Sequence, residues 1–121
     1  MIIAVDFDGV ISFYDHWKGK GVFGAPVKGC QEALSYLKEQ GHTIIVYTCR
    51  LEIDKVQEYL LAHGVPFDYI NYNPDNYKQM LHPAKIVADV YIDDRGVCFQ
   101  GQWDKEFVSQ IVNFKPWGKK V

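Results

Sequence analysis

The sequence has no excess of positive charge and no closely spaced cysteine pairs. Lys and Arg number 13 against 15 Asp and Glu, a formal net charge of −2, so the chain lacks the general positive field that holds a nucleic-acid backbone. Cys30, Cys49 and Cys98 are its 3 cysteines, too few and too widely spaced for a disulfide framework or a paired-cysteine zinc site. These absences predict a reducing, cytoplasmic location and no nucleic-acid partner.

Long apolar runs are also missing. The apolar start of the chain stops at Asp6 with no basic segment before it, and no run approaches the ~18 residues of a membrane span, so no membrane association is expected. A domain usually takes about 100–200 residues, and the chain has 121, of which 48% are hydrophobic and 23% charged. We therefore expect one globular domain over residues 1–121 with its own core.

Apolar runs and helical patterns alternate along the chain. Short runs rich in β-branched residues at 2–5, 43–48 and 88–92 predict strands buried in a parallel sheet. Apolar residues at helical spacing predict helices at 27–40 and 53–63, each followed by a glycine that can end it. The alternation predicts an α/β fold with right-handed crossovers.

Shorter signals complete the expected organisation. Residues 69–70 and 97–99 predict a further short strand and an edge strand, and residues 105–112 predict a closing helix. Residues 9–24 are rich in glycine and aromatics without a helical period, so we expect an irregular excursion or small hairpin. Residues 71–83 contain Asn-Pro and His-Pro, which favour a loop.

The residues with the clearest chemistry stand at the ends of the predicted strands. Asp6 and Asp8 end the first strand and share a direction, because side chains alternate along an extended chain. Thr48 ends the second strand, and Asp93 and Asp94 follow the third. Parallel strands end at one edge of the sheet, where ligands bind, so four carboxylates are expected to converge there.

Such a cluster needs protonation or a cation. Like charges in a poorly solvated crevice repel by several kcal/mol, and ligands that are all oxygen suit a hard divalent ion, usually Mg²⁺ where substrate phosphates complete the shell. Thr48 offers a hydroxyl and Lys85 an ammonium to phosphate oxygens. Each motif alone is as readily a turn or a helix cap, and their coincidence at one edge favours a functional site.

Four ordered motifs resemble those of the haloacid dehalogenase-like (HAD) phosphohydrolase superfamily. They are Asp-Phe-Asp-Gly-Val at 6–10, the strand ending in Thr48, Lys85, and Tyr-Ile-Asp-Asp at 91–94. The resemblance covers nearly the whole chain and implies a single-domain Rossmannoid three-layer α/β/α sandwich with a mainly parallel sheet. Residues 9–24 correspond to the flap of the superfamily. Neither interval that carries a cap domain in related enzymes is long enough here, so a capless member with an open site is expected.

The resemblance also implies roles for individual residues. Asp6 resembles the nucleophile that forms an aspartyl-phosphate, and Asp8 the general acid and base. Thr48 and Lys85 resemble the phosphate-binding hydroxyl and the catalytic lysine. Asp6, Asp93 and the Asp8 backbone carbonyl would hold Mg²⁺ directly, with Asp94 acting through water or behind these ligands. The implied activity is Mg²⁺-dependent hydrolysis of phosphate monoesters.

Some assignments stay open. Lys85 precedes Asp93 by a shorter interval than is usual in the superfamily, so Lys78 is an alternative catalytic lysine. Cys49 and Arg50 directly follow Thr48 and are expected to contact the substrate. For Arg50, as for Arg95, a surface ion pair has equal weight.

Two other functions compete with the phosphatase. One is a phospho-acceptor receiver domain, which places its acceptor aspartate at the end of a middle strand, where this sequence has Thr48. The other is a non-catalytic Mg²⁺-binding protein, disfavoured because no catalytic position is lost. Small and macromolecular phosphate esters both suit the motifs. An open site needs cover, either from a large substrate or, as we expect, from a neighbouring subunit of a homo-oligomer over residues 9–24.

Overall fold

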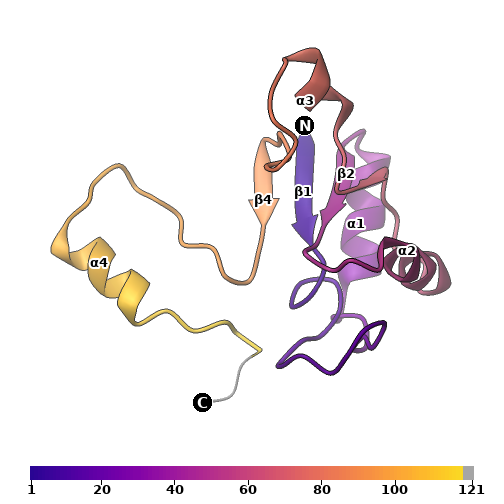
Figure 1. The fold of residues 1–121 in the computed structure, drawn as a ribbon, viewed down its shortest axis with the longest axis horizontal. Helices are drawn as coiled ribbons and strands as arrows, with labels where there is room; N and C mark the ends of the chain where they lie inside the picture. The colour runs from indigo at the N-terminus through magenta and orange to yellow at the C-terminus, as the bar shows by residue number, and fades with distance from the viewer. Residues whose placement is uncertain (119–121) are drawn as a thin grey trace.

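A four-stranded parallel sheet organises the computed structural model, which describes residues 1–118 (Figure 1). Its strand order is β3-β2-β1-β4. The strands are β1 (Ile2–Asp6), β2 (Thr43–Tyr47), β3 (Tyr69–Ile70) and β4 (Val90–Ile92). The predictions of an α/β fold and of a parallel sheet are confirmed.

The register of the sheet brings the strand ends together. β1 pairs with β2 from Ile2 opposite Thr43 to Asp6 opposite Tyr47, and it pairs on its other side with β4. The chain therefore runs from β1 to β2 and β3 in one direction and then crosses back to β4. In α/β sheets, ligands bind beyond the carboxyl ends of the strands at the point where this direction reverses, which here lies between β1 and β4.

Helices α1 (Cys30–Glu39) and α2 (Ile53–Ala62) line one side of the sheet. α1 is shorter than expected because Gly29 and Gly41, with φ of 87° and 86°, adopt left-handed conformations just outside its two ends. Leu34 and Leu60 from these helices are buried in the main core, together with the residues of β1 and β2 that face them. These strand residues are Ile3, Val5, Ile44 and Val46.

The flap, residues 9–24, has no helix or strand, so it is the irregular excursion and not the small hairpin, and it is tied to the domain. Phe23 packs edge-on against Phe7 and Tyr59 of the core, with ring centroids 5.2 and 5.4 Å apart. The Tyr59 hydroxyl donates to the Gly24 carbonyl at 2.8 Å. At least one aromatic side chain of the flap, Phe23, therefore packs on the core of its own domain.

Two local predictions were wrong. Residues 71–83 are not all loop, because α3 (Pro74–Lys78) forms there. The Asn73 side chain accepts from the Asp75 backbone N–H at 3.0 Å and Pro74 occupies the first turn, so Asn-Pro begins a helix here. Residues 97–99 form no strand, since the chain leaves the sheet after β4 and finds no ladder partner there.

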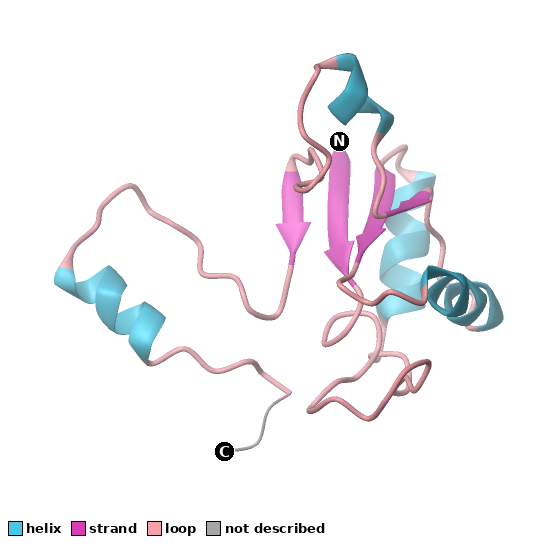
Figure 2. Cartoon of the chain, viewed as in Figure 1, coloured by secondary structure: helices cyan, strands magenta, loops and turns pink. Residues whose placement is uncertain are grey.

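The closing helix, α4 (Lys105–Val112), forms at the predicted residues, but its position differs from that in a three-layer sandwich. The ribbon drawing shows α4 standing well away from the sheet (Figure 2). The chain then returns to the flap, where the Trp117 indole N–H donates to the Gly9 carbonyl at 2.7 Å. Among residues 1–118, no helix is long and apolar enough to cross a membrane.

Candidate active site

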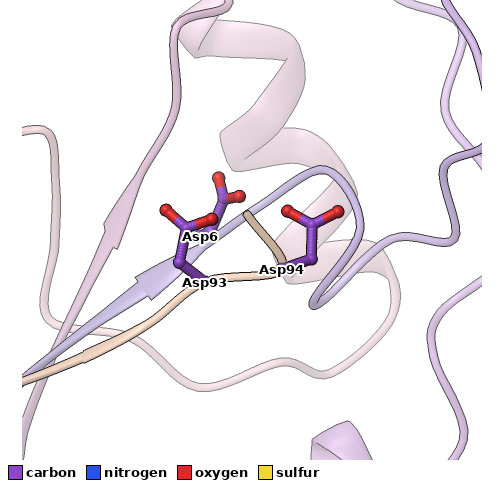
Figure 3. Close-up of side chains that lie close together, drawn as sticks. All are labelled: Asp6, Asp93 and Asp94. Atoms are coloured by element: carbon purple, nitrogen blue, oxygen red, sulfur yellow. The ribbon is translucent and has the colours of Figure 1, made fainter. Parts of the chain in front are cut away.

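Three carboxylates converge at the reversal point of the sheet. Asp6 ends β1, whereas Asp93 and Asp94 directly follow β4. One oxygen from each lies within 4.8 Å of the others. Figure 3 shows the three side chains pointing to the same side of the ribbon. The convergence expected from the strand ends is therefore present for three of the four acids.

The hydrogen-bond partners of these carboxylates are neutral groups, so these partners do not balance the negative charge of the cluster. Asp6 accepts from the Phe7 backbone N–H, and Asp93 accepts from the Tyr47 hydroxyl, each at 2.8 Å. One oxygen of Asp94 is buried without a hydrogen-bond partner. Within residues 1–118, none of the three carboxylates forms an ion pair with a lysine, arginine or histidine.

Burial and crowding change the acidity of this cluster. The pKa of Asp6 rises from 3.8 to about 7, first because burial disfavours its charged form and second because the Asp93 charge lies nearby. Burial and the Asp93 carboxylate likewise raise the pKa of Tyr47 above its ordinary value. A cation bound among the carboxylates would relieve the repulsion that produces these shifts.

The donor set fits a hard divalent cation such as Mg²⁺. All the available ligand atoms are oxygens, and the unpartnered Asp94 oxygen is the kind of buried polar atom that needs a ligand. Gly9 makes this arrangement sterically accessible, because a Cβ on its backbone would lie 2.2 Å from Asp94 Oδ2. Gly9 also has a φ of +88°, which side chains rarely tolerate.

Asp8 lies outside this cluster because Arg50 holds its carboxylate. Arg50 Nε donates to Asp8 Oδ2 at 2.8 Å and Nη2 donates to Oδ1 at 2.9 Å. The Arg50 guanidinium also donates to the carbonyls of Gly19 and Val22 in the flap. Only 2% of the Arg50 side chain is exposed, so it is neither a surface ion pair nor free to meet a substrate.

Thr48 has a hydroxyl available for an anion. Its backbone N–H and carbonyl form a reciprocal pair with the Asn71 side-chain amide, at 2.8 and 2.9 Å. Its Oγ1 accepts from the Arg50 backbone N–H at 3.1 Å. Since the oxygen accepts in that contact, the hydroxyl proton remains available to donate.

An open groove of about 1100 Å³ adjoins the carboxylates. Thr48, Cys49, Lys85 and Asp93 all line it, which brings together four of the predicted site residues. Lys85 Nζ lies 5.1 Å from the centroid of the Tyr91 ring, inside the same groove.

Lys78 lies elsewhere. Its side chain is 75% exposed on α3 and pairs with Asp75. Figure 1 places α3 beyond the amino ends of the strands, opposite the edge that carries Asp6. The geometry thus favours Lys85 over Lys78 as the lysine of this groove.

Arg95 is exposed, and its backbone N–H donates to Asp93 Oδ1 at 2.8 Å.

Sequence reasoning missed two residues of the site and one contact. The residues are Tyr47, which binds Asp93, and Asn71, which binds the Thr48 backbone. The contact is that of Arg50, itself an expected site residue, with Asp8. A signal existed for Tyr47, because the last residue of β2 lies opposite Asp6 once the strands are paired in parallel. The other two contacts join segments whose relative placement the sequence does not specify.

Comparison with known proteins adds a structural relative. No family model matches the chain, and no curated protein matches it. Among solved structures it resembles a conserved protein coded by a locus of Bacteroides thetaiotaomicron, with 30% sequence identity and a TM-score of 0.66. The match covers 93% of this chain and 88% of that chain. The chain therefore belongs to the same family as this conserved protein.

Proposed function

We propose that the protein is a Mg²⁺-dependent phosphohydrolase of the HAD type that cleaves phosphate monoesters through an aspartyl-phosphate on Asp6. The observation that carries the proposal is the cluster of Asp6, Asp93 and Asp94 within 4.8 Å at the reversal point of a parallel sheet. Thr48 and Lys85 line the adjoining groove, where a phosphoryl group would lie.

The strand order supports this proposal over a receiver domain. The sheet runs β3-β2-β1-β4, whereas flavodoxin-like folds, to which receivers belong, run 2-1-3-4-5. In the present order Asp6 ends β1, Asp93 and Asp94 follow β4, and Thr48 follows β2. A phosphoryl group bound by Thr48 and attacked by Asp6 suits this arrangement.

In the proposed first step, an Asp6 carboxylate oxygen attacks phosphorus while the bond from phosphorus to the leaving oxygen breaks. In this step Asp8 carries a proton on one oxygen, which gives up its contact with Arg50, while the other oxygen stays bound to Arg50; Asp8 donates that proton to the leaving oxygen, so the product departs as an alcohol. In the second step a water molecule gives its proton to Asp8 and attacks the aspartyl-phosphate. Phosphate leaves, and Asp6 and Asp8 return to their starting states.

The remaining residues bind and orient the phosphoryl group. The Thr48 hydroxyl donates to a phosphate oxygen, and the Lys85 ammonium balances the charge that the transferring group develops. Mg²⁺, held by Asp6 and Asp93 with Asp94 behind them, would neutralise charge on phosphate and carboxylates. Arg50 fixes Asp8 and the flap, so it positions the acid and base group and does not bind substrate.

The proposal includes a small or macromolecular phosphate ester as substrate and a cytoplasmic location. The groove is open and much larger than a phosphate group, which leaves room for either kind of leaving group. Cys30, Cys49 and Cys98 are all free thiols, which suits a reducing compartment.

Turnover of an aryl phosphate, measured with Mg²⁺ and with EDTA, tests the proposal. We expect hydrolysis that needs Mg²⁺, is abolished in Asp6→Asn, and falls by roughly 10²–10⁴-fold in Asp8→Asn, the usual range for acid and base catalysis. Asp54→Asn, which changes an exposed carboxylate on α2, is the matched control and should retain full activity. Normal turnover by Asp6→Asn, or in EDTA, would exclude this mechanism.

A further inference from the structure

The segment after β4 carries a large apolar surface that its own domain does not cover. We define the arm as residues 99–116, which contain α4. Exposed side chains include Trp103 and Val112, each 75% accessible. The others are Phe99, Val108, Ile111 and Phe114. Exposed apolar side chains gathered on one segment often mark an interaction surface.

The arm packs mainly on itself. Phe107 contacts Phe99 and Trp103, with ring centroids 5.3 and 5.0 Å apart. The hydrogen bonds shown by residues 99–116 involve partners within residues 98–116. Phe107 is therefore buried within the arm, whereas Val108 and Val112, one turn apart on α4, are 48% and 75% exposed.

Both ends of the arm are attached to the domain. Before it, β4 pairs with β1, and after it the Trp117 indole N–H donates to Gly9 while its ring packs edge-on against Phe13 at 5.8 Å. Between these two attachments, α4 lies well away from its own sheet (Figure 1).

The sheet has an uncovered surface next to the start of the arm. β4 is an edge strand, and Val90, Tyr91 and Ile92 are all about 40% exposed, on both faces of the sheet. The groove beside β4 is lined in part by Ile86 and Val97. Parallel sheets normally have both faces covered by helices, so this surface lacks the helix that the layer architecture requires.

We propose that a second copy of this chain covers β4 and its groove with the arm, in a reciprocal exchange that forms a two-fold dimer. Each copy carries both the apolar arm and the uncovered strand. In a two-fold dimer the arm of each copy covers the strand of the other, so the assembly is closed and neither surface stays exposed. The exposed fractions of the apolar side chains on the arm and β4 correspond to on the order of 800 Å² per copy, which is about the area that each partner contributes to a standard stable interface.

The exchange does not depend on the proposed chemistry, although it affects the same groove. Thr48 and Lys85 line the groove that the partner arm would border. The second copy would then provide the cover that the flap, which packs partly on its own domain, does not. This places the dimer contact on the arm and not on residues 9–24.

The first test measures the molar mass of the full chain by light scattering during gel filtration. We expect twice the 13.9 kDa of one chain and a monomer for the variant Val108→Asp/Val112→Asp. The control Leu51→Asp/Leu61→Asp changes two exposed leucines outside both surfaces and should remain dimeric. Circular dichroism checks that each variant is folded. A monomeric wild type, or a dimer that survives the arm substitutions, would overturn the proposal.

The second test distinguishes exchange from other arrangements on the unaltered protein. Isotopically heavy and light chains are refolded together and treated with a lysine-specific crosslinker. We expect crosslinked peptides that join Lys105 of the arm to Lys85 of the groove and combine one heavy and one light chain. Crosslinks of that pair only within single chains would mean that the arm folds back on its own domain. A ladder of larger oligomers would mean open-ended contact. Either result would refute the reciprocal dimer.

Discussion

The Arg50 guanidinium grips both carboxylate oxygens of Asp8, at 2.8 and 2.9 Å. The guanidinium carbon of Arg50 also lies close to two aromatic rings of the flap. It is 4.8 Å from the centroid of the Trp17 ring and 4.6 Å from that of Phe23. The hydrogen bonds to Asp8 raise the pKa of Arg50 above its ordinary value. One buried cation thus connects the proposed acid and base group to the flap, so the position of Asp8 depends on the closure of residues 9–24.

Arg50→Ala should therefore lower both stability and activity. Loss of one partner from a buried ion pair costs about 3–5 kcal/mol, and we expect the lower end because the Asp8 side chain keeps 19% exposure. Urea denaturation measures this change. Arg50→Lys keeps the charge but not the two-point grip, so kcat should fall by roughly 10-fold with an altered pH-rate profile. Lys55→Ala, which breaks an exposed pair with Glu58, should cost at most about 1 kcal/mol.

Gly9→Ala tests whether the space beside Asp94 is needed for metal binding. The added Cβ would meet Asp94 Oδ2 at 2.2 Å, so the carboxylate must move and Mg²⁺ affinity should fall at least about 10-fold, as when a ligand loses its orientation. Isothermal titration calorimetry measures the affinity. Gly41→Ala has a nearly identical φ of +86° and nothing within 4 Å. It should therefore show the backbone strain without the loss of affinity, and equal losses in both variants would contradict this role for Gly9.

The raised pKa of Asp6 predicts a pH-dependent stability in the absence of metal. Between its ordinary pKa of 3.8 and its folded pKa of about 7, the folded state binds a proton that the unfolded state has lost. The free energy of unfolding should therefore fall as the pH rises through this window and level off above it. Melting temperatures in EDTA from about pH 5 to 8 measure the slope. Asp6→Asn should remove this component, and parallel curves for the two proteins would contradict the prediction.

Most of the fold was predictable because its signals are local. β1 and β2 are short apolar runs whose two faces are both buried, and α4 begins where Asp104 caps the helix by accepting from the Phe107 N–H at 2.9 Å. The position of α4 in space was not predictable. Helical periodicity shows that a helix has an apolar stripe, but not whether that stripe packs on its own sheet or on another chain.

The candidate site was predictable where chemistry follows strand ends and not where it depends on loop placement. Asp6 and Asp93 are brought together by parallel pairing of β1 with β4, a consequence of topology that the sequence pattern already implied. The position of the Asp8 side chain depends instead on Arg50, which binds it. Arg50 is in turn surrounded by Trp17 and Val22 of the flap. No periodic pattern in residues 9–24 encodes that path.

Replacement of each candidate lysine separately should identify the catalytic one. Lys85→Ala should lower kcat by roughly 10²–10³-fold, because a fixed ammonium beside the transferring phosphoryl group offsets charge in the transition state. Lys78→Ala should leave kcat unchanged, since Lys78 pairs with Asp75 on α3. Both side chains are exposed, and the contact of Lys85 with the Tyr91 ring is worth about 0.5–1 kcal/mol at such a site, so neither change should unfold the protein. Steady-state kinetics with an aryl phosphate, paired with a melting curve for each variant, measures the difference. If Lys78→Ala were the inactive variant, the groove beside Thr48 would not be the phosphoryl site.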